Sequence, residues 1–122
     1  MGRNTLPESF YYAIVGVVSV FKSERNMKLH FFAALVVIIL AGLVNVTPFE
    51  WAVLVLTIFL VLAAETINTA IEKTVDLVTD NYHPLAEKAK NMAAGAVLLS
   101  AANAVIIAGL IFWPYVKVIF SG

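Results

Sequence analysis

Three long apolar runs in a chain of 122 residues limit what this sequence can fold into. They occupy residues 29–44, 51–64 and 92–113. Apolar residues make up 61% of the chain and the mean hydropathy is +0.92, which is more apolar surface than one small core can bury. A helix needs roughly 20 residues to cross the hydrocarbon core of a bilayer, so the first two runs must recruit flanking residues. We therefore expect an all-α membrane protein with three transmembrane helices.

The remaining composition excludes several classes of function. The chain has no cysteine, which removes thiol catalysis, disulfides and thiolate metal sites. Its net charge of zero argues against a nucleic-acid partner. Neither the phosphate loop of soluble kinases nor a His-Glu-x-x-His metal motif occurs. Residues 1–10 contain Pro7 and Glu8 and do not resemble a signal peptide, so we expect the spans themselves to direct the chain to the membrane.

The second apolar run continues without a helix breaker into a row of polar side chains. At about 100° per residue, Glu65, Asn68, Glu72 and Asp76 fall within a sector of about 80° on one helix face. The run needs part of this row to span the bilayer, which puts Glu65 near the membrane boundary and Asp76 about 16 Å further out. We expect Glu65 to be buried and the row to converge on one ligand.

The basic residues indicate the orientation of the spans. All but one of the 8 Lys and Arg residues lie before the first span or between the second and the third. These are Arg3, Lys22, Arg25, Lys28, Lys73, Lys88 and Lys90, whereas Lys117 lies near the C-terminus. By the positive-inside rule, the N-terminus and the polar row face the cytoplasm.

Two further segments complete the expected architecture. Residues 10–22 are too short to span, and Tyr11 and Tyr12 suit the headgroup region, so we expect an N-terminal amphipathic helix on the membrane surface. Residues 79–83 break the helical pattern, and Pro84 suits the first position of a new helix. We expect one domain over residues 1–122, with the surface helix at about 6–23 and spans at about 28–46, 49–78 and 84–114.

The third span carries a row of small residues. Ala96, Ser100, Ala104 and Ala108 recur every four residues and allow another helix to approach closely. Asn103 lies on nearly the same face as Ala96, and its amide needs a hydrogen-bond partner in hydrocarbon. Three spans offer few neighbours within one chain, so we expect a homo-oligomer with this row in a helix contact.

Acidic side chains and lysines gather at the cytoplasmic boundary of the spans. The group consists of Glu24, Glu65, Asn68, Glu72, Asp76 and Asp80 with Lys28, His83 and Lys90. It suits phosphoryl transfer, in which acids hold Mg²⁺, a lysine neutralises phosphate charge and another acid takes a proton from the attacking hydroxyl. The alternatives are a small oligomeric ion or proton transporter or channel that uses the same carboxylates, and a non-enzymatic membrane assembly subunit. Transport predicts polar residues through the depth of the spans, and their near absence from the first two spans favours interfacial chemistry.

Three segments of the sequence resemble one protein family. The first is Glu24-Arg25-Asn26, with Ala13-x-x-Gly16 upstream. The second is Glu65-x-x-Asn68-x-x-x-Glu72-x-x-x-Asp76, and the third runs from Tyr82-His83 to Ala89-Lys90-x-Met92-Ala93-Ala94-Gly95. Together they resemble the small integral-membrane kinases of bacteria, the diacylglycerol kinase and undecaprenol kinase family, over residues 10–111. The match is specific, because the spacing, the number of spans and the charge topology agree.

The resemblance implies a homotrimeric helical bundle that transfers the γ-phosphate of ATP to a lipid alcohol, undecaprenol or diacylglycerol, at the cytoplasmic face of the bacterial inner membrane. It implies a catalytic set of Glu65, Asn68 and Lys90, in which Glu65 is the general base and Asn68, like Asp76, has a supporting role. It implies that Glu24 and Glu72 hold Mg²⁺. The residues implied for the nucleotide site are Tyr12, Glu24, Glu72, Asn81, Tyr82, His83, Lys90 and Asn91.

Individual positions refine the resemblance. The family pattern usually has Asp after the lysine, where this chain has Asn91, which keeps an oxygen for hydrogen bonding and loses the charge. The run Glu24-Arg25-Asn26-x-x-x-His30 is closer to the undecaprenol kinase branch than to the diacylglycerol branch. Each site residue also has a structural alternative, such as a headgroup anchor for Lys90 and a helix cap for His83, and we expect His30 to be an interfacial residue.

Overall fold

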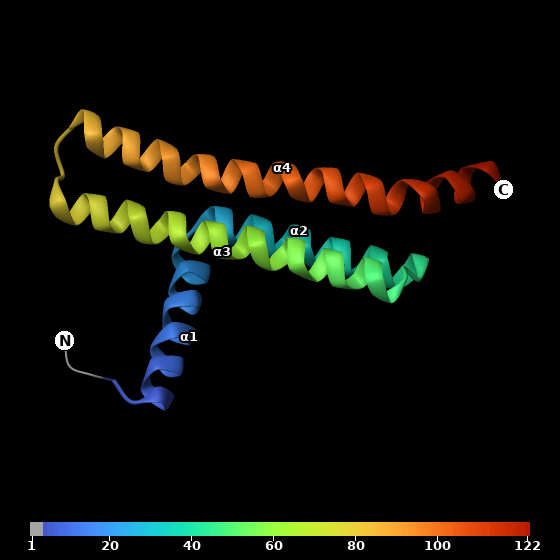
Figure 1. Cartoon of the computed structure of the whole chain (residues 1–122), viewed down its shortest axis with the longest axis horizontal. Coiled ribbons are helices and arrows are strands. Elements are labelled where there is room, and N and C mark those ends of the chain that lie inside the picture. The colour runs from blue at the N-terminus through green and yellow to red at the C-terminus, as the bar shows by residue number, and fades with distance from the viewer. Residues whose placement is uncertain (1–3) are drawn as a thin grey trace.

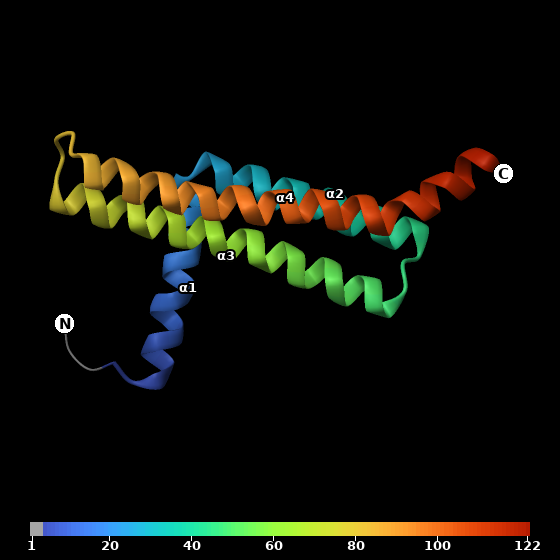
Figure 2. The ribbon, with the colours of Figure 1, turned by 45° about the horizontal axis from the view of Figure 1, so that its top comes forward.

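The structure is a computed structural model that describes residues 4–122 as four helices, α1 (Leu6–Ser23), α2 (Arg25–Val44), α3 (Pro48–Val78) and α4 (Pro84–Ser121). α3 and α4 run antiparallel and side by side, and α2 packs against α3 (Figure 1). α1 leaves this bundle sideways near the start of α2 (Figures 1 and 2). α2, α3 and α4 are each long and apolar enough to cross a membrane. The expected fold of three transmembrane helices and an N-terminal surface helix is confirmed.

α1 is attached to the bundle only near its C-terminal end. Val20 is buried there, and Phe21 packs edge-on against Phe31 of α2 with ring centroids 4.6 Å apart. Earlier in the helix, apolar side chains such as Phe10 and Ile14 are 64% and 62% exposed. An apolar surface of this kind on a helix that runs across the bundle suits the membrane interface.

Glu24 alone joins α1 to α2, and its extended backbone (φ −106°, ψ 120°) interrupts an otherwise continuous helix. α2 has 20 residues, which correspond to about 30 Å and match the thickness of a hydrocarbon core. α3 and α4 continue past the start of α2 toward the loop that joins them (Figure 1). The bundle therefore has a three-helix part of membrane thickness and a two-helix part that extends beyond it.

The apolar core lies at the end of the bundle away from this loop. Ala41, Leu54 and Ile111 are buried there, together with Val46 in the α2–α3 turn. The turn follows Asn45, whose left-handed backbone (φ 56°) lets the amide of Val46 donate to the carbonyl of Ala41 at 3.2 Å. This apolar core is thus remote from the polar row.

α4 continues to Ser121, past the end of the expected span at about residue 114. Pro114 lies inside the helix, where it cannot donate a backbone hydrogen bond, and the axis of α4 bends in this region (Figure 2). The hydroxyl of Tyr115, the next residue, donates a hydrogen bond to the carboxylate of Glu50 in the first turn of α3. The proline therefore bends α4 without ending it, and Tyr115 ties the bent part to α3.

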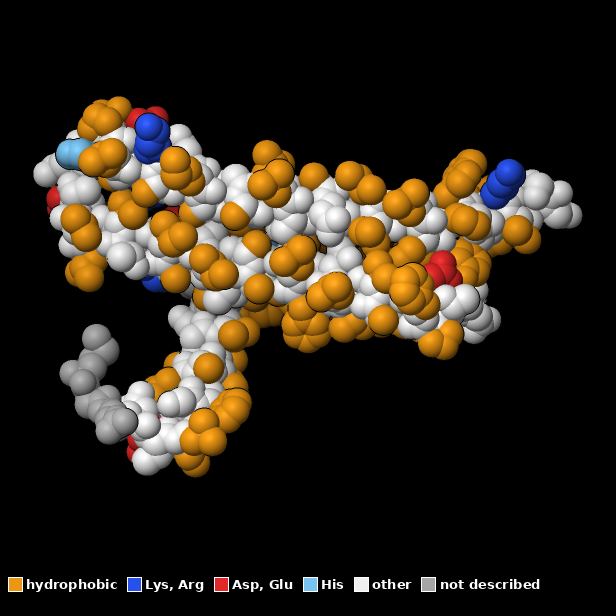
Figure 3. Space-filling model, viewed as in Figure 1, with side chains coloured by type: hydrophobic (Ala, Val, Ile, Leu, Met, Phe, Trp, Pro, Cys, Tyr) orange, Lys and Arg blue, Asp and Glu red, His pale blue; other side chains and the backbone are white. Residues whose placement is uncertain are grey.

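Charged side chains lie toward the two ends of the bundle, with an apolar surface between them (Figure 3). At the two-helix end they include Lys73, Lys88 and Lys90, whereas Lys117 lies toward the end of α4. Arg3, another basic residue of the expected cytoplasmic side, lies outside the described residues. This distribution fits a membrane crossing with the α3–α4 loop on the basic side.

Candidate active site

α3 buries one continuous face, and the polar row begins on that face. Leu54, Thr57, Val61, Glu65 and Asn68 are all buried and follow one another at intervals of three or four residues. Glu65 is only 2% exposed, which confirms its expected burial. A carboxylate therefore lies at the point where the apolar face of α3 gives way to polar side chains.

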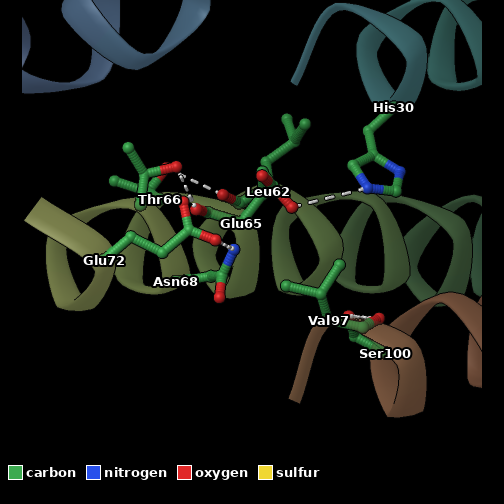
Figure 4. A network of polar contacts seen from close by, with 9 residues as sticks. His30, Leu62, Glu65, Thr66, Asn68, Glu72, Val97 and Ser100 are labelled. Atoms are coloured by element: carbon green, nitrogen blue, oxygen red, sulfur yellow. Dashed lines mark hydrogen bonds and ion pairs between the residues drawn. The ribbon is translucent and has the colours of Figure 1, made fainter. Parts of the chain in front are cut away.

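His30 of α2 faces this carboxylate (Figure 4). Its Nε2 atom lies 3.8 Å from Oε2 of Glu65, and its side chain is 23% exposed. Oε2 of Glu65 is itself buried and has no hydrogen-bond partner among residues 4–122. The separation is within the range of an ion pair and longer than a hydrogen bond, for which about 2.7–3.2 Å is usual. The packing of α2 on α3 brings these two groups together.

Asn68 lies one turn along α3 and reaches the next acid of the row (Figure 4). Its Nδ2 atom donates to Oε1 of Glu72 at 3.3 Å. Its Oδ1 atom is buried and, like Oε2 of Glu65, has no partner among the described residues. Asn68 thus orients Glu72, which is half-buried, and leaves one acceptor open.

Glu24 brings a third acid to this region from the joint between α1 and α2. It is half-buried, and its charge and that of Glu72 both act on Glu65. Residues 4–122 contain no group of three or more His, Asp or Glu side chains that could hold a metal ion. Mg²⁺ commonly takes one or two carboxylates and completes its shell with water and phosphate oxygens. The pair Glu24 and Glu72 therefore fits Mg²⁺ bound together with phosphate, and not a cage made of protein alone.

A cleft of about 420 Å³ lies between the end of α3, the α3–α4 loop and the start of α4. Its lining includes Asp76, Asn81, Tyr82, His83, Lys90 and Asn91. Nζ of Lys90 lies 2.6 Å from Oδ1 of Asp76 across this cleft. We call it the loop cleft, and we call Glu24, Glu65, Asn68 and Glu72 the carboxylate group.

Two residues of the loop cleft also make structural contacts. Nδ1 of His83 accepts a hydrogen bond from the amide of Leu85 at 3.1 Å, so His83 caps α4. The Glu87 carboxylate near the Tyr82 hydroxyl, with a further contribution from desolvation, raises the pKa of Tyr82 above its ordinary value of 10.0. The Tyr82 hydroxyl therefore stays a neutral donor at physiological pH.

The residues expected at the nucleotide site do not all meet within one chain. Asn81, Tyr82, His83, Lys90 and Asn91 line the loop cleft, whereas Glu24 and Glu72 belong to the carboxylate group. Tyr12 lies on α1, is 56% exposed and packs edge-on against Tyr11 with ring centroids 5.4 Å apart. It does not line the loop cleft. The candidate site thus consists of two neighbouring groups on the bundle and one residue on the surface helix.

The sequence alone does not single out His30 as a functional residue. α2 is apolar nearly all the way around, so its residues do not indicate which face meets α3. The sequence does indicate that the two residues lie at a similar depth in the membrane, because His30 is at the start of the first span and Glu65 is at the end of the second, on the same side. The contact between the two becomes evident only from the packing of the helices.

The row of small residues on α4 is partly used inside the chain. Ser100 is buried, and Ala104 and Ala108 line a cavity of about 200 Å³ between α2, α3 and α4. Asn103 lies in a different groove, between α3 and α4, which also includes Asn68. Part of the row therefore faces helices of the same chain, and Asn103 remains exposed on the bundle.

A model of the prokaryotic diacylglycerol kinase family matches residues 11–112, which include the carboxylate group and the loop cleft. The undecaprenol kinase of Bacillus subtilis (strain 168) is 44% identical to this chain over 111 residues, which cover 91% of this chain and 90% of that protein. The diacylglycerol kinase of Synechocystis sp. is 47% identical over 107 residues, which cover 87% of this chain and 61% of that protein. The diacylglycerol kinase of Helicobacter pylori (strain J99) is 35% identical over 115 residues, 94% of this chain and 83% of that protein.

Proposed function

The chain belongs to the prokaryotic diacylglycerol kinase family and is a lipid kinase, and we propose that it transfers the γ-phosphoryl group of ATP to the hydroxyl group of a membrane lipid. The observation that carries the proposal is the position of Glu65. This buried carboxylate lies at the end of the apolar face of α3, next to further acids and toward a cleft that contains Lys90. An ionisable group at that depth is costly and is by default a functional group.

In the proposed reaction, Glu65 is the general base. The hydroxyl oxygen of the lipid forms a bond to the γ-phosphorus, and the bond between that phosphorus and the oxygen of ADP breaks. The proton of the hydroxyl moves to the carboxylate of Glu65, which later releases it to water. A lipid hydroxyl lies at the membrane interface, so a base at the boundary of α3 reaches it without lifting the lipid out of the bilayer.

Glu24 and Glu72 are the proposed ligands of Mg²⁺. The metal neutralises phosphate charge and orients the γ-phosphoryl group when it is bound. Asn68 has the supporting role of fixing the carboxylate of Glu72, to which it donates a hydrogen bond at 3.3 Å. Glu24 comes from the joint of α1 and α2, so α1 helps to position the metal ligands.

The loop cleft is the proposed nucleotide site. Lys90 supplies positive charge for the phosphates, and Asp76 holds its ammonium group in place. The other residues that we assign to nucleotide binding are Tyr12, Asn81, Tyr82, His83 and Asn91. Of these, Tyr12 contributes from the surface helix, whereas the loop residues contribute from the end of the α3–α4 pair.

We also propose that the chain works as a homotrimer, a single kinase domain in the bacterial inner membrane with its N-terminus in the cytoplasm. Asn103 is exposed at membrane depth, where its amide needs a hydrogen-bond partner that a neighbouring chain can provide. Basic residues at the α3–α4 loop end support the cytoplasmic orientation.

The test is transfer of labelled phosphate from ATP with Mg²⁺ in mixed micelles that contain undecaprenol or diacylglycerol. We expect label in one of the two lipids, and a loss of about 10²- to 10⁴-fold in Glu65→Gln. Glu50→Gln is the matched control, because it makes the same change on the same helix at the end remote from the site. The lipid that takes the label identifies the acceptor class.

Absence of transfer to both lipids, from protein that is folded and oligomeric, would contradict the proposal. The transport alternative then predicts an ion or proton flux through the protein in liposomes that depends on Glu65. Equal activity of wild type and Glu65→Gln would leave the lipid kinase standing and remove the assigned base.

A further inference from the structure

Oε2 of Glu65 is a buried acceptor without a hydrogen bond in the described part of the chain, and the nearby hydroxyl donors on α3 bond to backbone carbonyls. The hydroxyl of Thr66 donates to the carbonyl of Leu62 at 2.8 Å, and that of Thr69 to the backbone carbonyl of Glu65 at 3.0 Å. Asn68 donates to Glu72. His30, on a different helix, faces Oε2 of the carboxylate with its Nε2 atom (Figure 4).

A buried carboxylate needs such a partner because its charge is costly away from water. The charges that act on Glu65 from its own helix and from the α1–α2 joint are those of Glu72 and Glu24, and both are negative. The segment of α4 drawn beside it contributes Val97 and Ser100, and the Ser100 hydroxyl donates to the Val97 carbonyl at 2.8 Å. The Asn68 amide also acts on Glu65, yet Oε2 stays without a hydrogen bond, and the imidazole of His30 lies 3.8 Å from this atom.

We propose that His30 is a positioning residue for the base: its Nε2–H donates to Oε2 of Glu65, keeps the carboxylate ionised and turns the other oxygen toward the hydroxyl of the acceptor lipid. This inference rests on the proposed lipid kinase activity and adds a residue to it. The separation of 3.8 Å closes to a hydrogen bond with a movement of about 0.8 Å. The His30 side chain is partly exposed and has room for it.

The first experiment measures the contact without turnover. The chain has 2 histidines, His30 and His83, so ¹⁵N labelling of histidine gives two sets of ring resonances in detergent micelles. His83→Asn assigns them. We expect Glu65→Gln to shift the Nε2 resonance of His30 and to leave that of His83 in place. A His30 resonance that does not respond to Glu65→Gln overturns the proposal.

The second experiment separates positioning from packing by kinetics. His30→Leu removes the donor at similar size, and we expect kcat to fall about 10- to 100-fold while KM for ATP stays constant. His30→Gln keeps an N–H donor and should restore most of kcat. Phe32→Leu, at a side chain that is 68% exposed on the same helix, is the matched control and should behave as wild type.

The outcomes of the kinetics are distinct. Equal losses in His30→Leu and His30→Gln, a change in KM alone, or an unchanged kcat in His30→Leu each overturn the positioning role while the lipid kinase stands. If His30→Leu does not fold, failure of His30→Gln to keep kcat overturns the role instead. A wild-type protein without lipid phosphorylation overturns the proposed function and this role with it, whereas the resonance shift still reports whether the two side chains meet.

Discussion

Nζ of Lys90 on α4 lies 2.6 Å from Oδ1 of Asp76 on α3, so an ion pair bridges the two long helices at the loop cleft. The side chains are 40% and 62% exposed, and exposed pairs of this kind contribute only about 0.2–1 kcal/mol to stability. The main role of the ion pair is therefore to position the ammonium group of Lys90. It places a positive charge in the cleft that we assign to the nucleotide phosphates.

Separate substitutions of the two partners should distinguish these roles. Lys90→Met removes the charge for the phosphates, and we expect KM for ATP to rise by about tenfold or more. Asp76→Asn leaves the charge but loosens its position, so we expect a smaller rise in KM. Because an exposed ion pair contributes little to stability, we expect only a small shift of the thermal unfolding midpoint in either variant. Equal effects of the two on KM would contradict the assignment of Lys90.

Asn68→Leu should weaken the use of Mg²⁺. The substitution removes the hydrogen bond that orients Glu72 and leaves Glu72 itself in place. We expect a higher Mg²⁺ concentration for half-maximal phosphate transfer, with KM for ATP measured at saturating Mg²⁺ unchanged. Asn68→Asp, which removes the N–H donor and adds a charge, should have a larger effect. An unaltered Mg²⁺ titration in both variants would count against Glu72 as a metal ligand.

Asn91→Asp should keep or raise the rate of phosphate transfer. Asn91 lines the loop cleft directly after Lys90, at the position where the family pattern that the sequence resembles has Asp. The substitution restores that charge in a cleft that already contains the other nucleotide residues. The measurement is kcat and KM for ATP in mixed micelles. A collapse of activity would show that the amide of Asn91 has a role of its own.

Tyr115→Phe should lower stability without changing catalysis. The Tyr115 hydroxyl donates to the Glu50 carboxylate, and this contact ties α4 to α3 beyond Pro114, at the end of the bundle remote from the site. We expect a lower thermal unfolding midpoint in detergent and an unchanged kcat. Val116→Ala, at the next residue of α4, serves as a control for loss of side-chain volume. A fall in kcat at constant stability would mean that the two ends of the bundle are coupled.

Asn103→Leu should weaken the proposed trimer. The Asn103 amide is exposed on the bundle at membrane depth, and a neighbouring chain is the partner that would hydrogen bond to it. We expect less trimer in crosslinking and in sedimentation. Ala102→Leu is the control, because Ala102 is also exposed on α4 and carries no polar group. Unchanged oligomers in Asn103→Leu would place the trimer contact elsewhere.

Much of the fold was predictable because the signals lie within single helices. The continuation of the second apolar run into the polar row placed Glu65 at a buried boundary, and the structure gives it 2% exposure. Pro84 was predicted as the first residue of α4, and α4 begins there. The continuation of α4 past Pro114 was less evident, because a proline removes one backbone hydrogen bond and can bend a helix that neighbouring contacts support.

Relations between helices were harder to predict. The rotation of α2 about its axis decides that His30 meets Glu65, and a helix that is apolar nearly all round carries no pattern that fixes this rotation. The same limit applies to α4. The small residues at every fourth position predicted a helix contact, but not whether the other helix belongs to the same chain or to a neighbouring one. Ala104 lines a cavity with α2 and α3 of its own chain, whereas Asn103 lies in a groove with α3 and stays exposed.

The part of α3 beyond Glu65, residues 66–78, is about 20 Å long and stands past the start of α2 together with the first turns of α4. On the proposed function, nucleotide reaches the loop cleft from a volume of cytoplasm, while the lipid reaches Glu65 from an area of bilayer. The rate of encounter with nucleotide then depends on its amount per volume, whereas the rate of encounter with lipid depends on its amount per area of membrane. Diluting the acceptor with inert lipid slows turnover even when the amount of acceptor per litre is held fixed, so membrane composition becomes a control on the enzyme.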